Sequence, residues 1–177
     1  MSRRAVGRPP GVPGVLAPGV VDQLRFLWWT ERGFLHGTTR GSWRERFTSA
    51  VLAVGWWPSL VLTIPMVLVQ AHSPHRRQYM SPGRDAVLAV KAASEGLWVV
   101  EDHVSRQPGS GQGRRLRNLV IRPLLKAADA SAVTIEVTAA NQRLIDSYRA
   151  ELEGLQVADE PRQGRGVRLR RLPILPS

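Results

Sequence analysis

Glu101, His103 and Tyr148 carry side chains of types that can take part in proton transfer. A carboxylate or an imidazole can serve as general base, and a free histidine has a pKa of about 6.5, which suits that role. A phenol can serve as general acid toward a leaving group. Strand alternation predicts that Glu101 and His103 share one face, with Asp102 facing solvent on the other. The alternative for each residue is structural: a polar surface side chain, or a tyrosine packed on a helix face.

A glycine-rich segment, residues 108–113, connects a predicted strand to a predicted helix. Such a connection exposes successive backbone N–H groups, the helix dipole adds positive potential, and glycine lets the chain approach a phosphate closely. Arg114 and Arg115 occupy the first helical turn, where cations are unfavourable unless an anion is bound. The spacing is G-x-G-x-G rather than the G-x-G-x-x-G of dinucleotide-binding proteins. The segment predicts a phosphate-binding loop, with a flexible surface turn as the alternative.

The pattern after residue 96 alternates between strands and helices. Period-two runs predict strands. An amphipathic helix, which Pro123 should kink or shorten, is predicted from apolar residues that recur at helical spacing: Leu116, Leu119, Val120, Leu124 and Leu125. The order strand, helix, strand, helix, strand, strand predicts an α/β sheet with crossover connections. The predicted strands are 97–105, 132–138, 155–158 and 167–172, and the predicted helices are 114–130 and 141–153.

Two spaced motifs resemble the acyl-coenzyme A-binding half of N-acetyltransferases of the GNAT superfamily. Gly111 and Gly113 match the paired glycines of the motif Q/R-x-x-G-x-G/A, which opens a helix after a strand. Asn141 and Tyr148 match the superfamily's N-x-x-x-x-x-x-Y helix, and Gly154 with the following leucine resembles its closing Gly-Phe. The resemblance runs from about residue 97 to the end of the chain.

The resemblance implies a GNAT-like mixed sheet over residues 81–177, binding acetyl-coenzyme A and transferring its acetyl group to an amine that the sequence does not identify. It implies that the pyrophosphate lies on residues 109–114 and the pantetheine arm along strand 97–105. Tyr148 would protonate the leaving thiolate, with Glu101 or His103 as the base. The expected cofactor-binding residues are Val104, Ser105, Arg106, Gly109, Ser110, Gly111, Gln112, Gly113, Arg114 and Asn141.

The sequence departs from the superfamily pattern in three places. Pro108 stands at the Q/R position, so Arg106 or Gln107 would have to serve instead. One or two extra residues separate Tyr148 from Gly154. The first half of the superfamily fold is not recognisable, and we therefore expect it to be divergent or replaced.

The region before residue 81 is predicted in three parts. Residues 1–19 are rich in Pro and Gly and predict a disordered basic tail. Residues 20–80 form a hydrophobic region in which 47–71 contains no charged side chain, which fits either a membrane-spanning helix or two buried strands joined by a turn. Pro58 and Pro65 argue against an uninterrupted span. Residues 81–95 predict a helix that begins at Ser81-Pro82 and stops at Gly96.

The charge balance leaves two rival classes of function. A formal net charge of +11 suits an anionic partner such as nucleic acid, an anionic membrane surface or a phosphate-bearing cofactor. The rivals are a non-catalytic or membrane-anchored acyl-coenzyme A-binding protein and a basic nucleic-acid-binding protein, although no nucleic-acid-reading motif is present. The chain has no cysteine, and no metal site is predicted. A cytoplasmic or membrane-associated location is expected, with the acyl-coenzyme A site in the cytoplasm.

Overall fold

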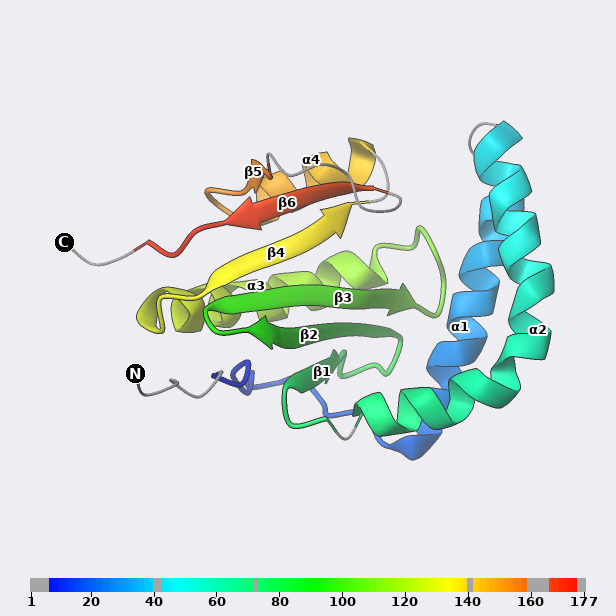
Figure 1. Ribbon diagram of the computed structural model, residues 1–177, viewed down its shortest axis with the longest axis horizontal. Helices are drawn as coiled ribbons and strands as arrows, with labels where there is room; N and C mark the ends of the chain where they lie inside the picture. Colours follow the sequence, from blue (N-terminus) through cyan, green and yellow to red (C-terminus); the bar gives the residue numbers. More distant parts are fainter. Residues whose placement is uncertain (1–6, 40–42, 72, 140–141, 159–165, 175–177) are drawn as a thin grey trace.

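The computed structural model of the protein describes residues 7–39, 43–71, 73–139, 142–158 and 166–174. Within these ranges a six-stranded mixed sheet has the order β1-β2-β3-β4-β6-β5, with α3 and α4 behind it and α1 and α2 at one end (Figure 1). The strands are β1 (Arg76–Met80), β2 (Ala86–Ser94), β3 (Leu97–Ser105), β4 (Thr134–Ala139), β5 (Gln156–Val157) and β6 (Val167–Arg171). The helices are α1 (Val20–Thr38), α2 (Trp43–Ala71), α3 (Gln112–Ala130) and α4 (Gln142–Glu151).

The mixed α/β architecture predicted from residue 97 onward is confirmed. β3 pairs with β4 in parallel through the crossover helix α3, and β6 pairs antiparallel with both β4 and β5. Helix α3 continues through Pro123 without being shortened, because proline removes one hydrogen bond of a helix that is otherwise held by packing. β1 lies before residue 81, so the sheet crosses the domain boundary expected there.

Two groups of buried side chains on the α3 side hold the sheet and its helices together. One joins β2 and β3 to α3 through Leu88, Val90, Trp98 and Leu116. The other joins α3 and α4 to β4 and β6 and includes Tyr148. A third and smaller group, comprising Phe26, Trp29, Met80 and Val87, attaches α1 to β1 and β2.

The helix predicted over residues 81–95 is wrong, because residues 86–94 form strand β2. Its first five residues are all apolar and all buried. Such a run does not distinguish a buried strand from a helix. Ser81 caps a turn rather than a helix: its hydroxyl accepts hydrogen bonds from the backbone N–H groups of Asp85 and Ala86, each at 3.0 Å. Gly96 stops no helix but provides the positive φ of the turn between β2 and β3.

The described part of the expected disordered tail, residues 7–19, packs against the sheet. Leu16 pairs antiparallel with Met80 at the edge of β1 through two backbone hydrogen bonds of 2.9 Å. The Tyr79 hydroxyl donates to the Pro10 carbonyl at 2.8 Å, and the Trp98 indole N–H donates to the Gly7 carbonyl at 2.8 Å. Residues 7–19 are therefore ordered by tertiary contacts, which local composition cannot indicate.

Residues 47–71 form a helix rather than the hairpin that was one of the two structures expected for them. They belong to α2, a 29-residue helix that contains Pro58 and Pro65, and Figure 1 shows that this helix bends along its course. Helix α2 lies beside α1. Among the residues that the structure describes, no helix is long and apolar enough to cross a membrane. The expected hairpin is therefore wrong, and the expected span has no support.

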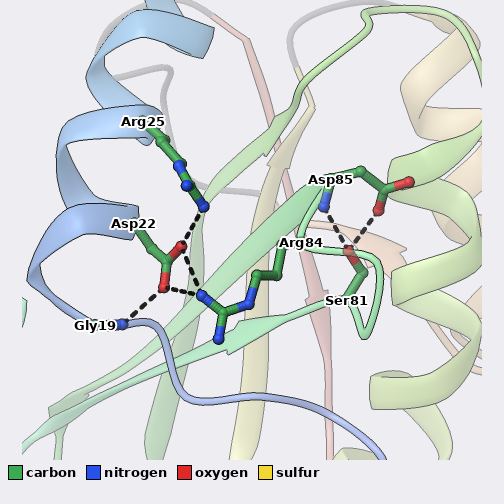
Figure 2. Close-up of polar contacts among 6 residues, drawn as sticks. All are labelled: Gly19, Asp22, Arg25, Ser81, Arg84 and Asp85. Atoms are coloured by element: carbon green, nitrogen blue, oxygen red, sulfur yellow. Dashed lines mark hydrogen bonds and ion pairs between the residues drawn. The ribbon is translucent and has the colours of Figure 1, made fainter.

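An ion-paired cluster attaches the start of α1 to the turn between β1 and β2 (Figure 2). The Asp22 carboxylate accepts a hydrogen bond from the Gly19 backbone N–H at 3.0 Å, which satisfies an otherwise open donor at the helix start. The same carboxylate contacts Arg25 at 3.2 Å and Arg84 at 3.4 Å. Arg84 has a φ of +50° in the turn. This cluster fixes where α1 crosses the sheet.

Candidate active site

An opening between β3 and β4 is the first feature of the candidate site. The two strands pair from Leu97 with Thr134 up to Val100 with Val137, and their described residues pair no further. Beyond that point β4 continues beside β6, β3 continues beside β2, and Figure 1 shows the two strands diverging. Among the described residues, 101–105 have no strand partner on the side of β4, and an extended ligand could form hydrogen bonds along this edge. Val104 and Ser105, two predicted cofactor contacts, lie on this edge.

A change of register in β3 separates two residues that were predicted to share a face. Glu101 is opposite Ala89, whereas Val104 is opposite Val87, with an irregularity between the two pairs. His103 therefore contacts α3, while Glu101 lies on the opposite side near β1. The expected common face is wrong, because a bulge inserts one extra residue and breaks the period-two alternation.

His103 lies against the first turns of α3. The guanidinium of Arg117 donates to His103 Nδ1 at 3.0 Å, and a Cβ built on Gly113 would stand 2.2 Å from His103 Nε2. Burial, together with the neighbouring Arg117 charge, lowers the pKa of His103 to about 4, so the imidazole is neutral at pH 7. Any larger residue at position 113 would collide with this imidazole, so the position requires glycine.

Arg117 is the centre of a buried polar network that we call the Arg117 cluster, and only 5% of the residue is exposed. Its guanidinium donates to both carboxylate oxygens of Glu151 and to the Ser147 hydroxyl at 3.0 Å. Burial alone would raise the pKa of Glu151, but the hydrogen bonds and charge of Arg117 outweigh it and hold that pKa below its usual value. The members of the cluster are His103, Arg117, Ser147, Tyr148 and Glu151.

Tyr148 lies on the buried face of α4, with 5% of the residue exposed. Its ring packs with Val137 and Ala139 of β4, and the guanidinium of Arg117 lies 5.2 Å from the ring centroid. Burial raises the pKa of Tyr148, so the phenol keeps its proton at neutral pH. Tyr148 and His103 thus approach the same arginine, one from α4 and the other from β3.

The glycine-rich segment forms a tight loop that leads into α3. The Ser110 hydroxyl donates to the Gln107 carbonyl at 2.7 Å, and the Gln112 side-chain oxygen accepts from the Gln107 backbone N–H at 3.0 Å. Gly109 and Gly111 have φ values of +83° and +80°, which favour glycine.

The start of α3 leaves room for an anion. Gly111 is the N-cap residue and supplies no side-chain cap, so the first helical N–H groups remain open to a ligand. No described atom lies within 4 Å of a Cβ built on Gly111. Arg106 and Arg114 are exposed beside this position. Asn141, the remaining predicted contact, lies outside the described residues.

Sequence reasoning did not identify Arg117, Ser147 or Glu151 as part of the site. Arg117 directly follows the buried Leu116 in α3. The spacing of the apolar residues in this helix does not indicate that an arginine at position 117 is buried. Ser147 and Glu151 are one helical turn apart, as are Gly113 and Arg117. This four-residue spacing is the one sequence feature that links these residues, and pairs of exposed residues on helices commonly have the same spacing.

Comparisons with known proteins identify the fold. No protein-family model matches the chain, and no curated protein is significantly similar to it in sequence. Solved structures are similar: a PaiA N-acetyltransferase from Thermoplasma acidophilum in complex with coenzyme A has 7% identity and a TM-score of 0.59, covering 89% of this chain and 97% of its own. Aminoglycoside acetyltransferase AAC(6')-Ib, in complex with coenzyme A and kanamycin, has 17% identity and a TM-score of 0.55, with coverages of 89% and 93%.

A third solved structure, an acetyltransferase from Streptococcus agalactiae 2603, has 10% identity and a TM-score of 0.51 and covers 90% of this chain and 99% of its own. The likeness thus extends over about nine-tenths of the chain and is not restricted to the half that carries the motifs. Helices α1 and α2, with the strands before residue 97, supply the part of the fold that could not be recognised in the sequence. The chain has the fold shared by these acetyltransferases.

Proposed function

We propose that this protein transfers an acetyl group from acetyl-coenzyme A to an amine. The observation that carries the proposal is the opening between β3 and β4, which lies beside the uncapped start of α3. The free edge of residues 101–105 suits the amide groups of a pantetheine arm. The open N–H groups at Gly111 and the exposed Arg114 suit its pyrophosphate. The match of the fold to coenzyme A complexes supports the same ligand.

The proposed reaction is direct transfer. The amine nitrogen attacks the thioester carbonyl carbon, a C–N bond forms, and the C–S bond breaks. Glu101 accepts a proton from the attacking amine, directly or through water, because it is 34% exposed on the free part of β3. Tyr148 donates its proton to the departing thiolate, and the raised pKa keeps that proton available at neutral pH.

We assign His103 a structural role rather than that of the base. Both ring nitrogens are engaged or covered: Nδ1 accepts from Arg117, and Nε2 faces the backbone at Gly113. Glu101 is not enclosed in this way and lies on the other side of β3.

The proposed base can be tested by steady-state kinetics of thiol release from acetyl-coenzyme A with a panel of primary amines. Glu101→Gln should lower kcat by about 10²-fold or more, which is the usual contribution of a general base. Glu95→Gln, an exposed carboxylate in the turn between β2 and β3, is the matched control and should retain full activity. Wild-type turnover by Glu101→Gln would refute the assignment. Binding of acetyl-coenzyme A without turnover of any amine would instead indicate a non-catalytic protein.

A further inference from the structure

A cavity of about 320 Å³ lies between α1, α2 and the first three strands. This volume is at the lower end of the range for small-molecule sites, about 300 Å³ to 1,000 Å³. Its wall is mainly apolar and comes from both helices and the sheet. The apolar lining includes Phe26, Leu27, Trp56, Met66, Val87 and Val104.

Charge in the lining of this cavity is concentrated at one place. Among the described residues that line it, Arg76 of β1 alone is charged, and 5% of that residue is exposed. Its Nε lies 3.7 Å from an Oε atom of Glu101, an ionic contact longer than a hydrogen bond. Glu101 does not line the cavity itself, but its backbone is opposite Ala89 and its carboxylate contacts Arg76, both of which are lining residues. A cation and an anion therefore stand side by side against an apolar wall.

The polar side chains next to Arg76 are fixed by one another. The side-chain amides of Gln23 and Gln78 form two reciprocal hydrogen bonds, from α1 to β1. Both residues line the cavity, and Gln23 is buried. This pair holds α1 over β1 and offers a neutral polar border between the charged corner and the apolar wall.

The geometry points to a free α-amino acid with an apolar side chain as the amine acceptor, an inference that rests on the proposed acetyl transfer. An α-amino acid carries its ammonium and carboxylate groups on one carbon, which complements the neighbouring Glu101 and Arg76. Its carboxylate would pair with the buried guanidinium, a strong interaction where water is excluded. Its side chain would fill the apolar part of the cavity, near Phe26 and Leu27.

The position of Glu101 joins this cavity to the opening between the strands. Glu101 directly follows Val100, the last residue of β3 that pairs with β4, so it lies beside the opening as well as next to residues that line the cavity. The ammonium group at Glu101 gives one proton to the carboxylate, the resulting amine attacks the thioester carbonyl carbon, and the nitrogen releases its second proton to solvent as the amide forms. The C–S bond breaks, and the thiolate takes the Tyr148 proton. The products are an N-acetyl amino acid and coenzyme A.

The test compares acceptors that differ only in the carboxylate. With acetyl-coenzyme A present, thiol release would be measured with leucine and phenylalanine, with isoamylamine and phenethylamine as their decarboxylated forms, and with glycine. We expect kcat/KM to be about 100-fold or more lower for the decarboxylated amines, because they lack the carboxylate that would pair with the guanidinium of Arg76. Glycine should also be a poor acceptor, because it leaves the apolar wall uncovered.

Variants of two neighbouring arginines sharpen the test. Arg76→Gln should lower kcat/KM for leucine about 100-fold more than it lowers that for isoamylamine, and Arg76→Lys should recover part of the difference. Arg77→Gln is the matched control: it is the next residue in β1, and its guanidinium lies by Gly11, away from the cavity. Binding of acetyl-coenzyme A to each variant, followed by thermal shift, reports whether it is folded.

The outcomes separate this inference from the proposed function. If acetyl-coenzyme A binds and the decarboxylated amines are used as well as the amino acids, the acceptor class is wrong and acetyl transfer stands. Equal losses for leucine and isoamylamine in Arg76→Gln would also refute the role of the carboxylate. If acetyl-coenzyme A does not bind to the wild type, the proposed function fails and the acceptor assignment fails with it.

Discussion

The two helical layers of this protein differ in how they meet the sheet. On the side of α3 and α4, the space near the ends of the strands is filled by the Arg117 cluster, whose arginine and carboxylate are both largely buried. On the side of α1 and α2, the corresponding space is an apolar cavity with one charged corner. The first arrangement fixes side chains in place, and the second leaves room for a ligand. In the proposed function, the first side would hold the cofactor and the second would select the acceptor.

The largest expected effect is catalytic and comes from the filled side. Tyr148→Phe keeps the ring and its packing but removes the proton donor, so kcat should fall by about 10²-fold to 10⁴-fold with little change in acetyl-coenzyme A affinity. Steady-state kinetics with calorimetric binding would check this. Tyr79→Phe, the other tyrosine, is the control: it loses a hydrogen bond to Pro10 and about 1 kcal/mol of stability but no activity. A Tyr148→Phe enzyme with wild-type kcat would show that this tyrosine only packs.

A second prediction concerns the stability of the filled side. Glu151→Gln should lower the free energy of unfolding by about 3–5 kcal/mol, because it leaves the buried Arg117 guanidinium without its counter-charge. Urea denaturation would measure the loss. Glu153→Gln, an exposed carboxylate two residues later, should change stability by less than about 0.5 kcal/mol. Similar losses in the two variants would mean that the Arg117 cluster does not stabilise this side as the structure indicates.

The third prediction is a pH dependence that originates at His103. Its pKa is about 4 in the folded protein and about 6.5 when unfolded, so the unfolded chain takes up the proton first as the pH falls. Stability should therefore decline between pH 6.5 and pH 4, by up to about 3 kcal/mol, with no further loss from this residue below pH 4. Urea denaturation across this window would measure it. His103→Gln should flatten the decline, and an unchanged slope would contradict the lowered pKa.

Much of the second half of the fold could be predicted because local patterns and tertiary structure agree there. Strand β4 alternates, helix α3 carries a regular apolar stripe, and the loop between β3 and α3 has glycines at its two positive-φ positions. The candidate site was harder to predict. The bulge that turns Glu101 and His103 to opposite faces has no sequence signal, because alternation is broken by pairing with β2 rather than by the residues themselves.

The first half could not be predicted because its elements are defined by tertiary contacts. An apolar segment with two prolines suggested a span or a hairpin, yet α2 forms beside α1, where packing outweighs propensity. The first residues of strand β2 are buried on both faces, so they are all apolar, and this run of apolar residues led to the wrong prediction of a helix. The segment near Leu16 becomes ordered only by pairing with Met80. Each error follows from a contact between residues distant in the sequence.

The most direct test of the account is titration of the purified protein with acetyl-coenzyme A by calorimetry. The wild type should bind one equivalent, and Gly111→Val should bind far more weakly, because a branched side chain is strained at a φ of +80° and crowds the approach of a phosphate. Gly55→Ala, in α2 and with no atom near its Cβ, is the control and should bind as the wild type does. Absence of heat and of a thermal shift at about millimolar ligand in the wild type would contradict the proposed function.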